Sequence, residues 1–285
     1  MKKKDAYEVI IKPSRNLFYI DWQGLLHYSD LLFLLVWRDF VSKYKQTILG
    51  PLWFIIQPLL TTIVFTVIFG KVAKIPTDNL PPFLFYLCGL VIWDYFARCF
   101  NGISTTFIDN AQVFGKAYFP RLIVPMSIAI SNLIALAIQI VLFLGFYMYF
   151  KLFTPAGAFM HINIALAALP LIIIQAGIFG LGTGLWITAS TAKYRDLRHL
   201  SPFIIQLWMY ATPIIYPISA IPEKWRIILA INPMAAMVEL FRYGFFSASV
   251  INVHQLALSF AVTIIVLLSG ILVFNRVEKT FVDVI

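Results

Sequence analysis

The apolar residues of the chain fall into long hydrophobic stretches that are separated by short polar segments. A helix needs about 20 mostly apolar residues to cross the hydrocarbon core of a bilayer. Six stretches qualify, so the pattern predicts an all-α integral membrane protein with six transmembrane helices, all in a single domain over residues 1–285. Within residues 51–275, the predicted spans are 51–70, 81–100, 122–150, 163–190, 201–217 and 254–275, the fifth of them short.

The segment before the first span has a different periodicity. Between residues 30 and 50, apolar side chains recur every three or four positions, while Arg38 and Lys45 lie on another face. This pattern is typical of an amphipathic helix that lies in the membrane interface. Gly50-Pro51 ends this helix, since proline suits the first turn of the span that follows. Residues 1–29 then form an N-terminal segment, and residues 276–285 form a C-terminal tail.

Two other segments outside the spans are expected to be helical. The loop between the second and third spans can form a short helix over residues 105–117. The segment 218–252, before the last span, contains Asn232-Pro233, in which a good N-cap residue precedes proline at the first helical position. We expect two short external helices that re-enter the membrane interface and are broken at this dipeptide.

Composition and charge agree with a multi-pass membrane protein and suggest its orientation. The chain is 61% hydrophobic and 12% charged, whereas a soluble domain carries about a quarter charged residues. The net charge of +9 therefore does not indicate a nucleic-acid partner. Lys and Arg concentrate in alternate loops, with sixteen of the 22 on the side that holds both termini. Cytoplasmic loops carry such an excess, so both termini are predicted to be cytoplasmic.

The sequence offers little enzymatic chemistry. It contains no P-loop motif for ATP and neither of the common zinc-protease and hydrolase motifs. The four histidines are scattered, and the two cysteines, Cys88 and Cys99, lie in an apolar stretch as packing residues. We therefore expect no catalytic residues, no metal site and no cofactor bound by this chain.

Charged and aromatic residues inside the second span are the strongest candidates for a pathway. Asp94 and Arg98 are four residues apart, so they can pair on one helix face and orient the helix, or they can line a pathway. Phe83, Tyr86 and Trp93 belong to a deep aromatic group that can stack on the apolar faces of sugars or simply pack. In the fourth span, Gly180 and Gly184 form a small-xxx-small pattern that favours close helix packing over a lining role.

Several runs resemble one known family over nearly the whole chain. The run RDFVSKYKQTILGPLWFIIQPL (38–59) resembles the N-terminal signature of the polysaccharide-export permeases of the ABC-2 transporter family. The run NAQVFGKAYFPRLIVP (110–125) resembles the segment through which that family couples to its ATPase. The runs YRDLRHL, ATPIIYP and NPMAAMVELFRYGFF follow in the family's order at compatible spacing.

The resemblance implies a function as well as a fold. Members have six spans with cytoplasmic termini in the bacterial inner membrane and form homodimers. A separate ATPase subunit binds ATP and magnesium. The substrate is a polysaccharide on a polyprenyl pyrophosphate lipid, with O antigen the nearest match and capsule or teichoic acid polymers as relatives. Two alternatives stay open: an exporter of small molecules or lipids, and a membrane-embedded transferase of lipid-linked sugars, for which Asp94 is the only deep acid.

The resemblance also assigns roles to particular residues. The residues expected to transmit motion from the ATPase are Asp109, Asn110, Phe114, Lys116, Tyr194, Arg195 and Asp196. Those expected near the substrate entrance, where a pyrophosphate or anionic lipid headgroups would be attracted, are Arg38, Lys43, Lys45 and Gly50. The channel candidates are Phe83, Tyr86, Trp93, Asp94 and Arg98, and the external gate is expected at Asn232 and Pro233.

Overall fold

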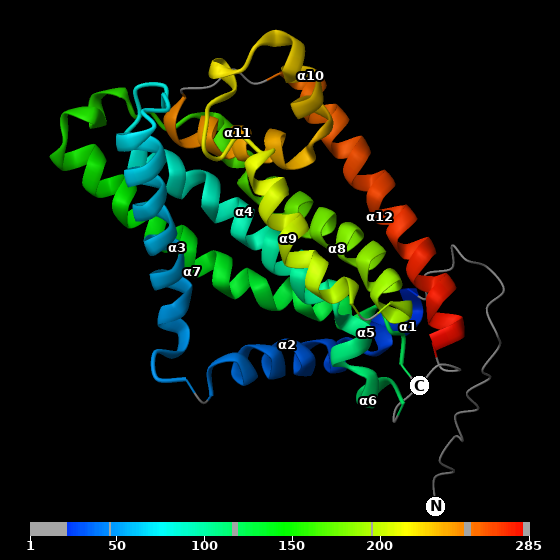
Figure 1. Ribbon diagram of the computed structural model, residues 1–285. Helices are drawn as coiled ribbons and strands as arrows, with labels where there is room; N and C mark the ends of the chain where they lie inside the picture. Colours follow the sequence, from blue (N-terminus) through cyan, green and yellow to red (C-terminus); the bar gives the residue numbers. More distant parts are fainter. Residues whose placement is uncertain (1–21, 46, 116–118, 195, 248–251, 282–285) are drawn as a thin grey trace, which may run out of the picture.

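The computed structural model describes residues 22–45, 47–115, 119–194, 196–247 and 252–281, which form helices and contain no strand (Figure 1). The α-helices are α1 (Trp22–His27), α2 (Ser29–Tyr44), α3 (Trp53–Phe65), α4 (Pro82–Ser104), α5 (Thr106–Asp109), α6 (Ala111–Phe114), α7 (Ile123–Phe153), α8 (Leu169–Lys193), α9 (Leu197–Tyr210), α10 (Glu223–Ile231), α11 (Pro233–Phe246) and α12 (Val253–Phe281). Shorter helical segments are η1 (Gly50–Leu52), η2 (Thr66–Val72, a π-helix), η3 (Pro155–Phe159), η4 (Ile164–Ala168) and η5 (Ile218–Ala220). The predicted all-α fold is confirmed.

Long apolar helices make up most of the bundle. Five segments of the described chain are long and apolar enough to cross a bilayer, and they coincide with the first four predicted spans and the sixth. They are Gly50–Val72, Pro82–Ser104, Ile123–Phe153, Ile164–Lys193 and Val253–Glu278. The helices α10 and α11 qualify only as a pair, and this pair is bent by 102°. The chain is therefore a multi-pass membrane protein, as predicted.

The predicted fifth span, 201–217, differs from the structure. Its helix is α9, whose 14 residues are about 21 Å long, too short to cross a hydrocarbon core of about 30 Å. The helix ends at Tyr210, and turns follow it. Pro213 and Pro217 explain this end, because proline lacks the N–H group that an α-helix needs to continue.

The central element of the bundle is α4, which packs against α3, α7, α8 and α11. In its span, 78% of the residues are buried, against 22–33% in the other four spans. Glycines on α8 permit the close approach of α8 to α4. A Cβ atom on Gly180 would lie 2.8 Å from the Cβ atom of Cys99, and one on Gly184 would lie 2.7 Å from that of Ile103. The predicted role of this glycine pair in close packing is confirmed.

A second close crossing joins α8 to α12. A Cβ atom on Gly182 would lie 2.8 Å from the Leu267 Cα atom, and one on Gly270 would lie 3.1 Å from the Gly182 carbonyl carbon and closer still to its oxygen. Nearer one end of the same pair, the Gln175 amide donates to the Ser259 hydroxyl at 2.7 Å. The two helices are thus joined by backbone contact and by a buried polar link.

One end of the bundle carries the predicted interface helix. Figure 1 shows α2 lying across the ends of the spans, beside α1, α5 and α6. It ends at Tyr44 rather than at residue 50, and the φ of +49° at Gly50 lies in the left-handed region. Phe33 and Trp37 are 66% and 67% exposed, while Leu35 is buried. This amphipathic pattern agrees with the predicted interface helix.

The opposite end of the bundle carries the bent pair of α10 and α11 (Figure 1). The break falls at Asn232, whose side-chain oxygen accepts a hydrogen bond from the Met234 backbone N–H at 3.1 Å. The same oxygen accepts from the Trp208 indole N–H at 3.2 Å, and the amide group donates to the Thr212 hydroxyl at 3.0 Å. The predicted break at Asn232-Pro233 is confirmed, and the cap also anchors α11 to α9.

Candidate functional site

The loop between α4 and α7 lies at the same end of the bundle as α2. We predicted one helix over residues 105–117, but the structure has two single turns, α5 and α6, that meet at Asn110. The Asn110 amide donates to the Thr106 carbonyl at 3.1 Å, and such side-chain bonds compete with continuation of a helix. Lys116 falls outside the described residues.

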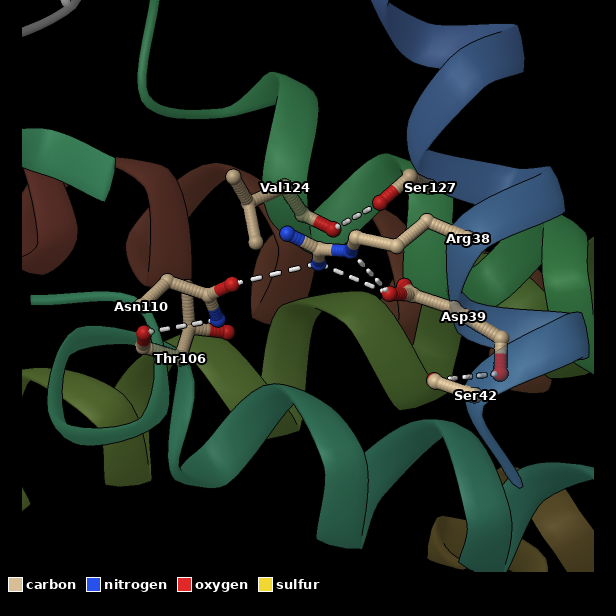
Figure 2. A network of polar contacts seen from close by, with 7 residues as sticks. All are labelled: Arg38, Asp39, Ser42, Thr106, Asn110, Val124 and Ser127. Carbon is tan, nitrogen blue, oxygen red and sulfur yellow. Dashed lines mark hydrogen bonds and ion pairs between the residues drawn. The ribbon is translucent and has the colours of Figure 1, made fainter. Parts of the chain in front are cut away.

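A polar junction joins this loop to α2. The Arg38 guanidinium donates to the Asp39 carboxylate at 2.7 and 3.0 Å, and its Nη2 atom also donates to the Asn110 side-chain oxygen at 3.3 Å. Figure 2 shows the Arg38 side chain reaching from α2 toward Asn110. Asn110 is only 8% exposed, whereas the Arg38 side chain is 39% exposed. Arg38 therefore holds the interface helix to the loop and still presents part of its charge to the surroundings.

Aromatic packing joins the same loop to α12. The Phe107 ring stacks on Phe274, with centroids 4.8 Å apart and planes 8° apart, and Phe114 packs edge-on against Phe107. The Arg121 guanidinium lies 5.6 Å from the Phe114 ring centroid and donates to the Glu278 carbonyl at 3.1 Å. Phe114 is thus a buried anchor of the loop, and the Phe107 ring connects it to α12.

Exposed groups at this end are available to a partner protein. Asp109 is exposed and accepts a hydrogen bond from the Thr105 hydroxyl at 2.6 Å. Tyr194 is 55% exposed, with Lys193 over its ring at 5.2 Å, and Asp196 is exposed at the start of α9. The turn α5, which ends at Asp109, packs against α8, which Tyr194 follows. Asp109, Tyr194 and Asp196 therefore lie at the same end of the molecule. Arg195 lies outside the described residues, and the coupling role of the set stays a prediction.

The other predicted entrance residues, Lys43, Lys45 and Gly50, differ in their surroundings and in how far the structure describes them. Lys45 is exposed just after α2. Lys43 lies within α2, but its side chain is outside the described part of the chain. A Cβ atom on Gly50 would meet nothing within 4 Å, so glycine is required there by its left-handed backbone and not by crowding. Gly50 makes the corner between the interface helix and the first span.

The charged residues of α4 have partners that the sequence did not indicate. Asp94 accepts a hydrogen bond from the Gln139 amide of α7 at 3.4 Å. The Arg98 guanidinium lies 5.2 Å from the Phe54 ring centroid of α3. Asp94 and Arg98 form no ion pair at contact distance, although Arg98 still acts electrostatically on Asp94, and each side chain also contacts a neighbouring helix. These contacts support a structural role, and the lining role stays a prediction.

The aromatic channel candidates pack inside the chain. Tyr86 and Trp93 are 0% and 2% exposed. Phe83 is partly exposed and lies 4.8 Å from Phe146 of α7, measured between ring centroids. In the described part of the chain, no group of three or more His, Cys, Asp or Glu side chains is arranged to hold a metal ion.

Sequence reasoning placed two arginines in runs that resemble the family but gave neither a role of its own, and the structure makes both prominent. Arg121 links the loop to α12, as described above. Arg242 of α11 is 1% exposed and is the largest fully buried side chain. It donates to the Glu239 carboxylate at 2.6 Å. The three-residue spacing of Glu239 and Arg242 on a helix was the available signal.

A family comparison decides what kind of membrane protein this is. The model of the ABC-2 type transporter family matches residues 30–246, from the start of α2 to the end of α11. The chain belongs to the ABC-2 type transporter family. The match includes the Arg38–Asn110 junction and the bent pair, so the features at both ends of the bundle lie within the ABC-2 domain.

Individual relatives match nearly the whole ABC-2 chain. The O-antigen export system permease protein RfbA of Klebsiella pneumoniae is 29% identical over 275 residues, which cover 96% of this chain and 99% of the relative. A protein of the same name from Myxococcus xanthus is 26% identical over 91% of this chain and 96% of its own length. The polysialic acid transport protein KpsM of Escherichia coli is 25% identical over 88% of this chain and 93% of its own length.

Proposed function

We propose that this chain is the transmembrane subunit of an ATP-driven exporter of polysaccharide, most closely of the O-antigen type, in the bacterial inner membrane. The observation that carries the proposal is the near-full-length similarity to permeases named for O-antigen export. The ABC-2 family assignment fits a permease that uses a separate ATPase, which supplies the nucleotide and magnesium chemistry. The substrate proposed is a glycan on polyprenyl pyrophosphate.

Two copies of the chain are proposed to form the pathway. In a single copy the central helix α4 is buried, so the described chain encloses packed side chains where a tunnel would have to lie. A tunnel wide enough for a sugar then requires a second copy, and a closed two-fold dimer is the commonest such assembly. Both termini are proposed to lie in the cytoplasm, following the distribution of Lys and Arg.

The end that carries α2, α5 and α6 is proposed to receive the ATPase and the lipid-linked substrate. Closure of the ATPase would push on Asp109 and its neighbours, and the buried rings of Phe107 and Phe114 carry the motion to α12. Arg38 joins the same loop to α2. Its partly exposed guanidinium and Lys45 supply positive charge for a pyrophosphate group at the entrance.

The test is to co-express the chain with an ATPase subunit and measure polyprenyl-linked glycan on both membrane faces. We would compare the unsubstituted chain with the triple variant Asp109→Ala, Asn110→Ala, Lys116→Ala. The control, Glu223→Ala, removes an exposed carboxylate at the opposite end. Accumulation of glycan inside, with the two subunits still co-purifying, is the expected result. If no glycan depends on the chain at all, the polysaccharide assignment fails and an exporter of small molecules or lipids replaces it.

A further inference from the structure

A buried arginine, paired with a glutamate of its own helix, connects the bent pair of helices to the centre of the bundle. The Arg242 guanidinium donates through Nη1 to Glu239 one turn earlier on α11, at 2.6 Å. Through Nη2 it donates to the Pro213 carbonyl, in the turns that follow α9, at 3.1 Å. Its central carbon lies 3.8 Å from the Phe85 ring centroid of α4. One planar cation thus joins α11, the turns after α9 and the central span.

The surrounding chain leaves room for this cation. A Cβ atom on Gly89 of α4 would lie 3.4 Å from the Arg242 Nη2 atom and 3.1 Å from a side-chain carbon of Ile214. A side chain at position 89 would therefore crowd both the guanidinium and the turns after α9. Lysine could not reproduce all the contacts of Arg242, because a single ammonium group lacks the planar fork of the guanidinium, which reaches two acceptors and stacks on a ring.

The two members of the pair have different surroundings. Arg242 is enclosed, at 1% exposure, whereas Glu239 also lines a cavity of about 1010 Å³ at the end of the bundle that carries α10. Asp78 and His254 belong to the same cavity wall, so it is polar enough to hold water. The interior cannot hold an unpaired charge cheaply. When α11 moves, Glu239 travels with Arg242 and keeps its charge compensated, while the contacts of the guanidinium to the Pro213 carbonyl and the Phe85 ring are broken and water from the cavity can replace them.

We propose that Arg242, with its charge compensated by Glu239, forms a latch through the Pro213 carbonyl and the Phe85 ring that keeps α11, and with it the bent pair, against α4 while the outer end of the pathway is closed. The latch opens when α11 moves away from the turns after α9 during export. Arg242 is then a positioning residue of the outer gate and does not bind the substrate. The proposal rests on the export function proposed above, because it assumes that the end carrying α10 and α11 faces outward.

The chain contains its own reporter for this latch. Cys88 is on α4, next to Gly89 and three residues after Phe85, and it is 0% exposed. Cys99 is also 0% exposed and lies eleven residues further along the same helix, about 16 Å away. Cys99→Ala leaves Cys88 as the only thiol, and Cys88→Ala leaves Cys99 as the only thiol. Reaction with a membrane-impermeant maleimide then distinguishes local opening from general loosening.

The experiment labels spheroplasts that express the full chain with either Cys88 or Cys99 as its only thiol, each with and without Arg242→Gln. The substitution is expected to raise the labelling rate of Cys88 at least tenfold and to leave Cys99 at its background rate. The matched control, Arg226→Gln, removes an exposed cation of α10 and is expected to stay within twofold of the background. Arg242→Lys, which keeps the charge, is expected to give an intermediate rate.

Three results would overturn the latch. The first is an unchanged Cys88 rate in Arg242→Gln and Arg242→Lys, with normal membrane levels and size-exclusion profile. The second is equal acceleration at Cys99, which would mean general loosening. The third is labelling of Cys88 only in inverted vesicles, which would place this end in the cytoplasm. Labelling needs no transported glycan, so these outcomes are separate from the glycan measurement that tests the export function.

Discussion

The crossing of α8 and α12 at Gly182 and Gly270 gives the sharpest test of how this bundle is held together. We predict that Gly270→Ala destabilises the protein. The added methyl group would lie 3.1 Å from the Gly182 carbonyl carbon and nearer to its oxygen, whereas ordinary contacts begin at about 3.4 Å. The obstacle is backbone, so the side chains cannot relieve it by changing rotamer. The two helices must separate by about 1 Å, and overpacking of this kind costs about 1–3 kcal/mol.

The assay is the apparent melting temperature of the detergent-purified protein, followed by loss of its size-exclusion peak. For a chain of this size, 1 kcal/mol corresponds to about 2–4 °C, so a fall of about 2–12 °C is expected. The control is Gly145→Ala on α7, which is exposed and where a Cβ atom meets nothing within 4 Å. That variant is expected to melt within about 1 °C of the parent protein. Equal melting of the two variants would refute the argument from backbone contact.

Four further substitutions test other contacts. A double-mutant cycle of Arg38→Ala and Asn110→Ala should give a coupling free energy of about 0.5–1 kcal/mol for unfolding of the detergent-purified protein. Strictly additive effects of the two substitutions would show that the Arg38–Asn110 hydrogen bond does not stabilise the protein. Thr188→Val removes the buried hydroxyl that donates to the Ile103 carbonyl of α4 and should cost about 1 kcal/mol; no loss would mean that this bond contributes nothing. Asn232→Ala removes an N-cap and side-chain bonds to α9, so a loss of about 2 kcal/mol is expected, and protease cleavage near residue 232 should increase.

The bundle was largely predictable because its signals are local. Apolar runs predict five of the spans correctly, and the Asn232-Pro233 dipeptide predicts the position of the bend between α10 and α11. The length of α9 was overestimated, since hydropathy counts the apolar residues after Tyr210 and ignores the two prolines that prevent a helix there. Periodicity identified α2 but set its end near Gly50, where the chain actually has a left-handed corner.

The contacts within the candidate site were less predictable because they join distant parts of the sequence. Arg38 and Asn110 are 72 residues apart, and neither residue signals the other. The sequence allows Asp94 to pair with Arg98 on its own helix or to line a pathway, and it gives no sign that the helix crossing brings the Gln139 amide of α7 to the carboxylate. Partner choice in these cases depends on how helices pack, and a single sequence carries little information about packing.

The burial of α4 has a consequence for how the protein responds to its bilayer. A helix of 23 residues is about 35 Å long, whereas the 31 residues of α7 extend over about 46 Å. The hydrocarbon core is about 30 Å thick, so α7 fits only with tilt, and its tilt depends on bilayer thickness. Because α4 meets little lipid, thickness acts on the surrounding helices and leaves the central one as a fixed axis. We therefore expect that lipids of different acyl-chain length change the tilt of α7 relative to α4 without any substitution in the protein.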